Sequence, residues 1–247
     1  MTITTTQPLP KTLTFEEYLE YEGEEDTIYE LYQGQLIPMP QPTAVHAKIC
    51  QFLLYQLQQY LVQHNLPLVV VRTTGVRITE NTSRIPDIIV CSETLWQQIC
   101  ERGGAGVFDQ EETPNLVIEV TDENWRNDYI LKRAEYAFIK IPEYWIIDPN
   151  KGKIRLYSDP KDEESYQYQE LLPGQILTSV QFNDLQMPVD LILEPPVVER
   201  LIRQKQESRH QLEQELTIAQ QRAEMEHQRA ERLAQRLREL NIDPDQL

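Results

Sequence analysis

The sequence predicts a mixed α/β (α+β) domain with a mixed central sheet flanked by helices, followed by one long heptad helix. Short β-rich apolar runs alternate with amphipathic segments, and a β-rich stretch then ends near Leu193. After Pro195-Pro196, apolar residues recur in steps of four and three, which predicts the helix. The predicted parts are a disordered N-terminus at 1–12, a globular domain at 13–194 and a C-terminal coiled-coil helix at 195–247.

The composition indicates a globular protein without a membrane segment. Of the 247 residues, 40% are hydrophobic and 26% charged, which is ordinary for a globular domain. No apolar run reaches the roughly 18 residues that a membrane span needs, and the N-terminus lacks the features of a signal peptide. The cysteines are odd in number and lack CxxC spacing, so we expect reduced, mostly buried thiols and a cytoplasmic location.

The net charge of −17 is unevenly distributed along the chain. Residues 199–240 hold nine basic and eight acidic side chains and the last seven residues carry −2, so that residues 1–198 carry −16. This acidity does not favour a protein that coats nucleic acid through a broad basic surface. Any contact with DNA or RNA is expected to be local, metal-assisted or helped by oligomerisation.

Helix and strand signals can be read in order along the domain. Thr14 and Glu17 form a capping-box pattern that predicts a helix to about Glu22, and Thr43 begins a longer helix that runs to about His64. His46 falls beside the apolar stripe of that helix, where a lone histidine is more often structural than a ligand. Further predicted elements are two short strands turning at Gly34, strands at 66–71, 74–78, 84–91, 114–121, 143–149, 153–157 and 165–172, and helices at 95–99 and 127–140.

Two of these strands carry an acidic residue among aliphatic ones. Asp87 opens the run after Pro86, and Glu119 lies inside the run that ends at Val120. Ionised carboxylates are almost never placed in buried strands without a partner or a metal. The alternative is that Glu119 lies at the solvated end of its strand. In the following helix Asp128 and Lys132 are four residues apart. Taken alone, this spacing is typical of a solvated surface ion pair.

Asp87, Glu119 and Lys132 together form an ordered set with a recognisable chemistry. Two carboxylates on neighbouring strands can hold a divalent cation through oxygen ligands. Such a cation lowers the pKa of bound water and neutralises charge on a phosphoryl oxygen, and a lysine adds a point charge for the phosphate. Because these residue types are common, their spacing alone is a weak signal.

The amino-acid sequences of several stretches point to a family more specifically than this spacing does. They are TFEEYL (14–19), YELYQG (29–34), PTAVHA (42–47), PDIIV (86–90), LVIEV (116–120), the run from Asp128 through Lys132 to Tyr136, and PEYWIIDP (142–149). In these stretches, over roughly residues 13 to 193, the chain resembles the Uma-two family of restriction endonucleases in the PD-(D/E)XK nuclease superfamily. The resemblance implies a restriction-endonuclease-like fold and Mg²⁺, or Mn²⁺, as cofactor.

The resemblance also implies roles for particular residues. Asp87 and Glu119 would be metal ligands, with the carbonyl of Val120 as a candidate third. Lys132 would be the catalytic lysine, and Glu30 an additional acidic residue of the catalytic site.

One departure from the superfamily pattern concerns the lysine. It is expected two residues after the glutamate, where this chain has Thr121. The resemblance implies that the lysine has moved to the following helix, as Lys132. If Lys132 pointed to solvent instead, catalysis would be in doubt while the fold would stand.

The C-terminal segment follows a heptad pattern with a charged exterior. A lone amphipathic helix could fold back onto the domain, but a two-position stripe kept for about four heptads favours a self-paired coil and hence a homodimer. Asn241 and the residues up to Pro244 are expected to end it. The seam positions are Leu212, Leu216, Ala219, Ala223, Glu226, Ala230, Leu233, Leu237 and Leu240.

Two functions of different classes follow. The first is a metal-dependent endonuclease that hydrolyses phosphodiester bonds in DNA, with the coil pairing two catalytic domains so that both strands can be cut. The alternative is a non-catalytic interaction and oligomerisation protein that retains the nuclease fold. Action on RNA or another phosphodiester is not distinguished from action on DNA by the sequence.

Overall fold

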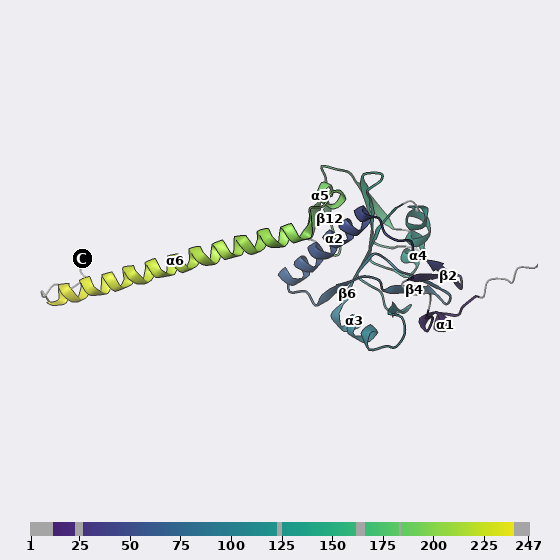
Figure 1. Ribbon diagram of the computed structural model, residues 1–247, viewed down its shortest axis with the longest axis horizontal. Helices are drawn as coiled ribbons and strands as arrows, with labels where there is room; N and C mark the ends of the chain where they lie inside the picture. Colours follow the sequence, from purple (N-terminus) through teal and green to yellow (C-terminus); the bar gives the residue numbers. More distant parts are fainter. Residues whose placement is uncertain (1–11, 23–26, 123–124, 162–165, 183, 240–247) are drawn as a thin grey trace, which may run out of the picture. The chain divides into compact units, whose positions relative to one another are not determined.

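The computed structural model describes residues 12–22, 27–122, 125–161, 166–182 and 184–239 (Figure 1). The chain divides into two compact units, Met1–Pro196 and Val197–Leu247. The predicted disorder of the N-terminus falls almost wholly on residues outside the described ranges, as does the predicted helix end after Leu240. Within the described ranges, no helix combines the length and the apolarity needed to cross a membrane.

A five-stranded sheet forms one part of the first unit, in the order β2-β1-β5-β4-β7. Helix α1 (Phe15–Leu19) precedes it and begins with the predicted capping box, in which Thr14 and Glu17 bond each other's backbone N–H groups. Leu31 pairs with Ser83 and thereby joins β1 to β5. The strands are β1 (Tyr29–Tyr32), β2 (Gln35–Pro38), β4 (Gly75–Thr79), β5 (Thr82–Arg84) and β7 (Val107–Phe108).

A six-stranded mixed sheet is the centre of the unit, in the order β11-β10-β9-β8-β6-β3. Only β8 and β9 run parallel, and the remaining neighbours are antiparallel. The predicted mixed sheet is confirmed. Its strands are β3 (Leu68–Val71), β6 (Ile88–Ser92), β8 (Leu116–Val120), β9 (Glu143–Asp148), β10 (Lys153–Ser158) and β11 (Gln167–Leu171), and a separate pair is formed by β12 (Ile176–Thr178) and β13 (Gln186–Pro188).

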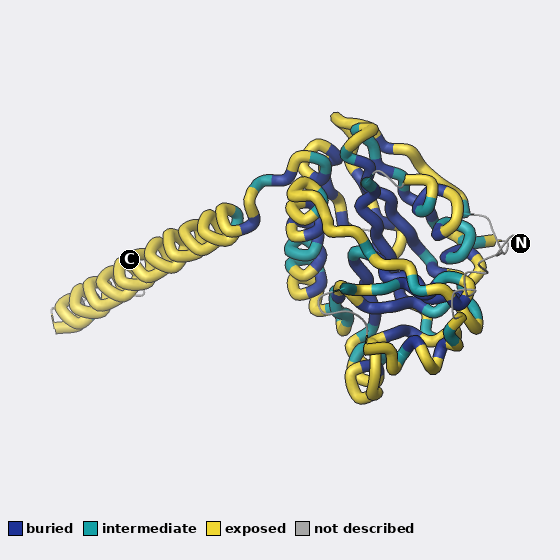
Figure 2. The backbone as a smooth tube through the Cα atoms, turned by 45° about the vertical axis from the view of Figure 1, so that its right-hand side comes forward, coloured by how far each residue is buried: buried dark blue, intermediate teal, exposed yellow. Residues whose placement is uncertain are grey.

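Helices cover this sheet, and the buried backbone runs through its central strands (Figure 2). Helix α2 (Ala44–Gln63) begins at the predicted cap, Thr43, and buries the apolar stripe that the sequence shows. The sequence pattern predicts Val45 in this stripe, but Val45, in the first turn of the helix, is exposed. The shorter helices are α3 (Glu93–Cys100) and α5 (Val189–Leu193).

The helix predicted from Asn127 is not a regular α-helix throughout. Residues Asn127–Lys132 form a π-helix, η1, and α4 (Arg133–Phe138) continues from it. A π-helix widens the backbone spiral locally and is costly, and such turns are found mostly at functional sites. Here the widened turn contains Asp128 and Lys132, both of which are buried.

Glu143 is a buried carboxylate at the start of β9 that the sequence reading did not single out. It accepts hydrogen bonds from Trp145 Nε1, the Ser179 hydroxyl and the backbone N–H groups of Val180 and Gln181. All of these groups are donors, so the carboxylate satisfies them without a cation. We therefore assign Glu143 a structural role in holding the 179–181 loop to the sheet.

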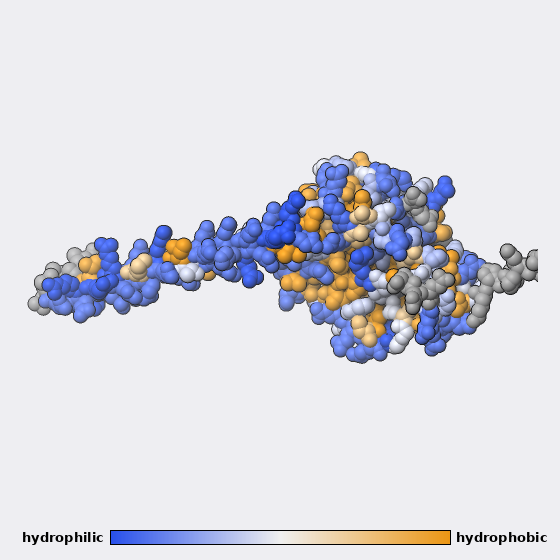
Figure 3. All heavy atoms as spheres, in the orientation of Figure 1, coloured by the Kyte–Doolittle hydropathy of each residue, from blue (hydrophilic) through white to orange (hydrophobic). Residues whose placement is uncertain are grey.

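In the described part of the second unit, α6 (Val198–Glu239) is a helix of 42 residues. Its leucines are exposed in the single chain, for example Leu212, Leu216 and Leu233. Figure 3 shows a few isolated apolar patches on the visible face of a helix that is otherwise hydrophilic.

Candidate active site

The candidate site forms where the chain passes from the five-stranded sheet to the six-stranded sheet. Asp87 immediately precedes β6, and Glu119 lies near the end of β8. Ile88 pairs with Ile118 across these antiparallel strands, so continuing the register by one residue places Asp87 beside Glu119. The Asp87 carboxylate accepts the N–H of Val120 at 2.8 Å, which fixes the aspartate against the end of β8.

Lys132 reaches this place from η1. Its Nζ lies 2.9 Å from Glu119 Oε1 and 3.1 Å from Glu30 Oε1. Asp128, one turn earlier, is 3.7 Å away. Lys132 is 5% exposed and Glu119 4% exposed. The reading of Asp128 and Lys132 as a solvated surface pair is therefore wrong, because the π-turn directs both side chains inward. The reading of Glu119 as the solvated end of its strand is also wrong.

Glu30 links the five-stranded sheet to η1 at the site. From β1 it receives hydrogen bonds from Arg84 Nη1 at 3.1 Å and from the backbone N–H of Ile85 at 3.0 Å. Arg84 also binds Glu135 of α4 through two hydrogen bonds of 2.7 and 2.8 Å. Burial opposes ionisation of Glu30, but Lys132 and Arg84 prevail and lower its pKa. Glu30 thus stays charged and holds Lys132 in position.

Glu119 has the opposite electrostatic balance. Burial raises its pKa well above the usual range, and the nearby carboxylates of Asp128 and Asp87 add to the increase against the attraction of Lys132. The Tyr136 hydroxyl donates to the same Oε1 at 3.0 Å. The carboxylates of Glu30, Glu119 and Asp128 thus surround one lysine. Asp87 lies beside Glu119, and the site holds an excess of buried negative charge. An excess of this kind fits a divalent cation, which prefers oxygen ligands.

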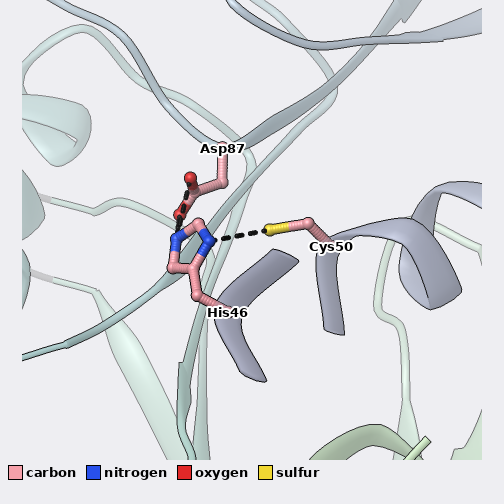
Figure 4. Close-up of side chains that lie close together, drawn as sticks. All are labelled: His46, Cys50 and Asp87. Atoms are coloured by element: carbon pink, nitrogen blue, oxygen red, sulfur yellow. Dashed lines mark hydrogen bonds and ion pairs between the residues drawn. The ribbon is translucent and has the colours of Figure 1, made fainter. Parts of the chain in front are cut away.

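His46 and Cys50 extend the site on the α2 side, and Figure 4 shows the imidazole lying between the thiol and Asp87. His46 Nε2 is 3.1 Å from each carboxylate oxygen of Asp87, and Nδ1 is 3.7 Å from Cys50 Sγ. One ligand atom from each of the three residues lies within 4.8 Å of the others, so these residues could hold a metal ion. The reading of His46 as a structural residue overlooked this contact, because only the fold brings α2 to Asp87.

The predicted site residues lie close together in the structure. The structure brings Glu119, Lys132 and Glu30 into direct contact, and Asp87 is linked to them through Val120, whose carbonyl is the predicted third ligand. Thr121, at the place of the expected superfamily lysine, is buried. The catalytic and metal-binding roles of these residues remain predictions. Asp128 and Tyr136 join the site although they had no predicted role.

The fold and the site define a nuclease-like α/β protein with a buried carboxylate and lysine cluster. The chain belongs to the Uma2 family, described as "Putative restriction endonuclease", whose family model matches residues 15–190. It is similar to the crystal structure of "a putative nuclease belonging to DUF820 from Anabaena variabilis ATCC 29413", with a TM-score of 0.55 and 18% identity. That match covers 74% of this chain and 98% of the other. No curated protein matches the chain.

Proposed function

We propose that the protein is a metal-dependent endonuclease that hydrolyses phosphodiester bonds in DNA. The observation that carries the proposal is the buried contact of Lys132 with Glu119, beside Asp87, in a chain of the Uma2 family. Burying this much negative charge is costly for the folded protein. A cost of this kind is typical of sites that bind a cation for a function.

Asp87 and Glu119, with the Val120 carbonyl, would hold Mg²⁺ or Mn²⁺. When bound, the ion supplies Lewis acidity and makes a water molecule more acidic. Lys132 remains protonated because the carboxylates around it outweigh the effect of burial and raise its pKa. Its ammonium can therefore stabilise negative charge on a phosphoryl oxygen. Glu30 and Asp128 hold the ammonium from two other sides and act as positioning residues.

We further propose that α6 joins two copies into a homodimer and that the protein acts in the cytoplasm. Exposed leucines at heptad spacing support the dimer. Three free cysteines, of which Cys100 is exposed, suit a reducing compartment. The acidity of the first unit requires that contact with DNA be confined to the site and its rim, or be helped by the more basic α6.

The first prediction concerns cleavage. Purified protein with Mg²⁺ or Mn²⁺ is expected to convert supercoiled plasmid DNA to nicked circles, and Asp87→Asn is expected to lower the rate at least about a hundredfold, since it removes a ligand charge. The measurement is the nicking rate on agarose gels. Asp159→Asn is a matched control because Asp159 has an exposed side chain outside the site, and its rate should be unchanged.

The outcomes separate the two functions. Nicking that survives Asp87→Asn would come from a contaminant and would contradict the proposal. The acidic charge of residues 1–198 and the long α6 favour the second candidate, an interaction protein that retains the nuclease fold. That candidate predicts no nicking and no rise in melting temperature with Mn²⁺. Replacing the plasmid with single-stranded or duplex RNA tests the substrate class.

A further inference from the structure

We propose that His46 is a direct metal ligand through Nε2, and that this nitrogen makes the site prefer Mn²⁺ and similar transition metals over Mg²⁺. The inference rests on the proposed function, because it assigns a further ligand to the same metal. The metal ligands predicted from the sequence, Asp87, Glu119 and the Val120 carbonyl, offer oxygen atoms alone.

The distance between His46 and Asp87 is the first support. Nε2 lies 3.1 Å from the Asp87 oxygens. Two ligand atoms at adjacent corners of an octahedral ion, each about 2.1 Å from the metal, lie about 3 Å apart. The pair already has this separation, so an ion can replace the hydrogen bond without a movement of either main chain.

The surroundings of the imidazole are the second support. Cys50 follows His46 by one helical turn, and its sulfur lies on the Nδ1 side of the ring (Figure 4). A metal-binding histidine usually donates its other N–H to a neighbour, which sets the tautomer. With the Nδ1 proton directed to Cys50 Sγ, the lone pair of Nε2 is free for the metal. Cys50 Sγ is within 4.8 Å of the other two ligand atoms, and in this proposal Cys50 serves as a positioning residue.

The preference between metals follows from the ligand type. Mg²⁺ binds hard oxygen ligands and retains its water molecules, whereas imidazole nitrogen suits transition metals. Removing the imidazole should therefore weaken Mn²⁺ binding by about tenfold to a hundredfold. The same change should affect Mg²⁺ much less, so the ratio of the two affinities falls.

Electron paramagnetic resonance of Mn²⁺ tests this assignment. Titration gives the dissociation constant, and electron spin-echo modulation detects ¹⁴N bound to the ion. The wild type and His64→Ala should show ¹⁴N coupling, and His46→Ala should lose it. His64 is the matched control because it is an exposed histidine at the other end of α2. Asp87→Asn should abolish the Mn²⁺ signal from the site. This loss would show that the ion detected is the one bound at Asp87.

The results test the role of His46 as a ligand separately from the proposed nuclease function. Mn²⁺ that binds in an Asp87-dependent way without ¹⁴N coupling would overturn the role of His46 and leave the proposed function standing. No Asp87-dependent binding in the wild type would overturn both. Coupling that persists in His46→Ala would assign the nitrogen to another residue and also contradict the inference.

A second inference comes from α6 alone: we propose that two copies of α6 pair antiparallel. The seam residues from Leu212 to Leu237 read L-L-A-A-E-A-L-L, and this order is almost the same in both directions. Antiparallel pairing centred between Ala223 and Glu226 therefore places Leu216 against the partner's Leu233 and Ala219 against the partner's Ala230. Each seam residue except Ala223 and Glu226, which face each other, still meets one of its own size, as packing requires.

Charge distinguishes the two orientations. In a parallel pair in register, each Glu226 at the seam would meet the partner's Glu226, and like charges at close range repel. In the antiparallel pair Glu226 faces the partner's Ala223, and this repulsion is absent. The flanking charges balance, because Glu215 then faces the partner's Arg236 while Arg222 faces the partner's Arg229. The seam glutamates therefore decide the orientation.

The orientation has a consequence for cleavage. The two starts of α6 would lie about 80 Å apart along the coil, since each residue of a helix adds about 1.5 Å. The coil would then not bring two catalytic sites onto one position of a duplex. We expect the two sites to cut independently of each other. Plasmid should accumulate as nicked circles before linear DNA forms.

Disulfide trapping tests the orientation in full-length protein that carries Cys100→Ser. Chains with Ala219→Cys and chains with Ala230→Cys are oxidised separately and as a mixture. Antiparallel pairing predicts a cross-linked dimer only in the mixture, whereas dimers in either separate sample would show parallel pairing and overturn the inference. Sedimentation of the wild type that shows only monomer would also overturn it. The nicking assay is independent of these results and tests the proposed function separately.

Discussion

Replacing Glu119 with Gln is expected to lower nuclease activity at least about a thousandfold and to make the metal-free protein more stable. Activity falls because the substitution removes a proposed ligand charge. Stability rises because Gln retains an oxygen for Lys132 and Tyr136 while removing one of the crowded carboxylates. We expect an increase of about 1–3 kcal/mol in the free energy of unfolding near pH 8.

The pH dependence of this effect has a definite sign. Because the pKa of Glu119 is raised in the folded protein, the folded state binds more protons than the unfolded state above the ordinary glutamate range. Metal-free stability should therefore fall as pH rises from about 5 towards 8, and Asp128, whose pKa is also raised by burial, contributes in the same direction. The fall should be smaller in Glu119→Gln.

Urea unfolding at several pH values, with and without Mn²⁺, measures both the change in the free energy of unfolding and its pH dependence. Glu207→Gln on α6 is a suitable control because its side chain is exposed and lies outside the site. Mn²⁺ should stabilise the wild type but not Glu119→Gln. A Gln variant that is less stable than the wild type at pH 8 in the absence of metal would contradict the idea that the site stores unfavourable charge.

Replacing Lys132 with Met is expected to have the largest effect on folding. Met retains most of the side-chain volume but leaves Glu30, Glu119 and Asp128 without their shared cation. Breaking a buried ion pair by removing one partner typically costs about 3–5 kcal/mol. Nuclease activity should also be lost, since no positive charge then faces the phosphate.

A divalent ion should partly replace the missing charge. We therefore expect Mn²⁺ to raise the melting temperature of Lys132→Met by more than it raises that of the wild type. Lys161→Met serves as the control, since Lys161 is exposed and its loss should change stability by less than about 0.5 kcal/mol. Equal effects of the two substitutions would show that Lys132 is not the cation that holds these carboxylates.

Local patterns in the sequence determined much of the architecture. The capping box at Thr14 predicted the start of α1, the apolar spacing after Thr43 predicted α2, and the aliphatic run around Glu119 predicted β8. Each of these signals depends on residues that are close in the chain. The mixed sheet followed from the order of such elements, and Glu119 and Lys132 were selected because their sequence context resembles a family.

Tertiary structure decided what these residues contact. Neither the π-turn that buries Asp128 and Lys132 nor the clamp of Arg84 between Glu30 and Glu135 leaves a local pattern. The approach of His46 to Asp87 joins residues 41 positions apart through the packing of α2. A carboxylate next to a lysine in sequence can be solvated or buried, and its pKa depends on the charges that folding gathers around it. The sequence by itself therefore determined the elements and the candidate residues, whereas only the fold decided that three carboxylates share one lysine.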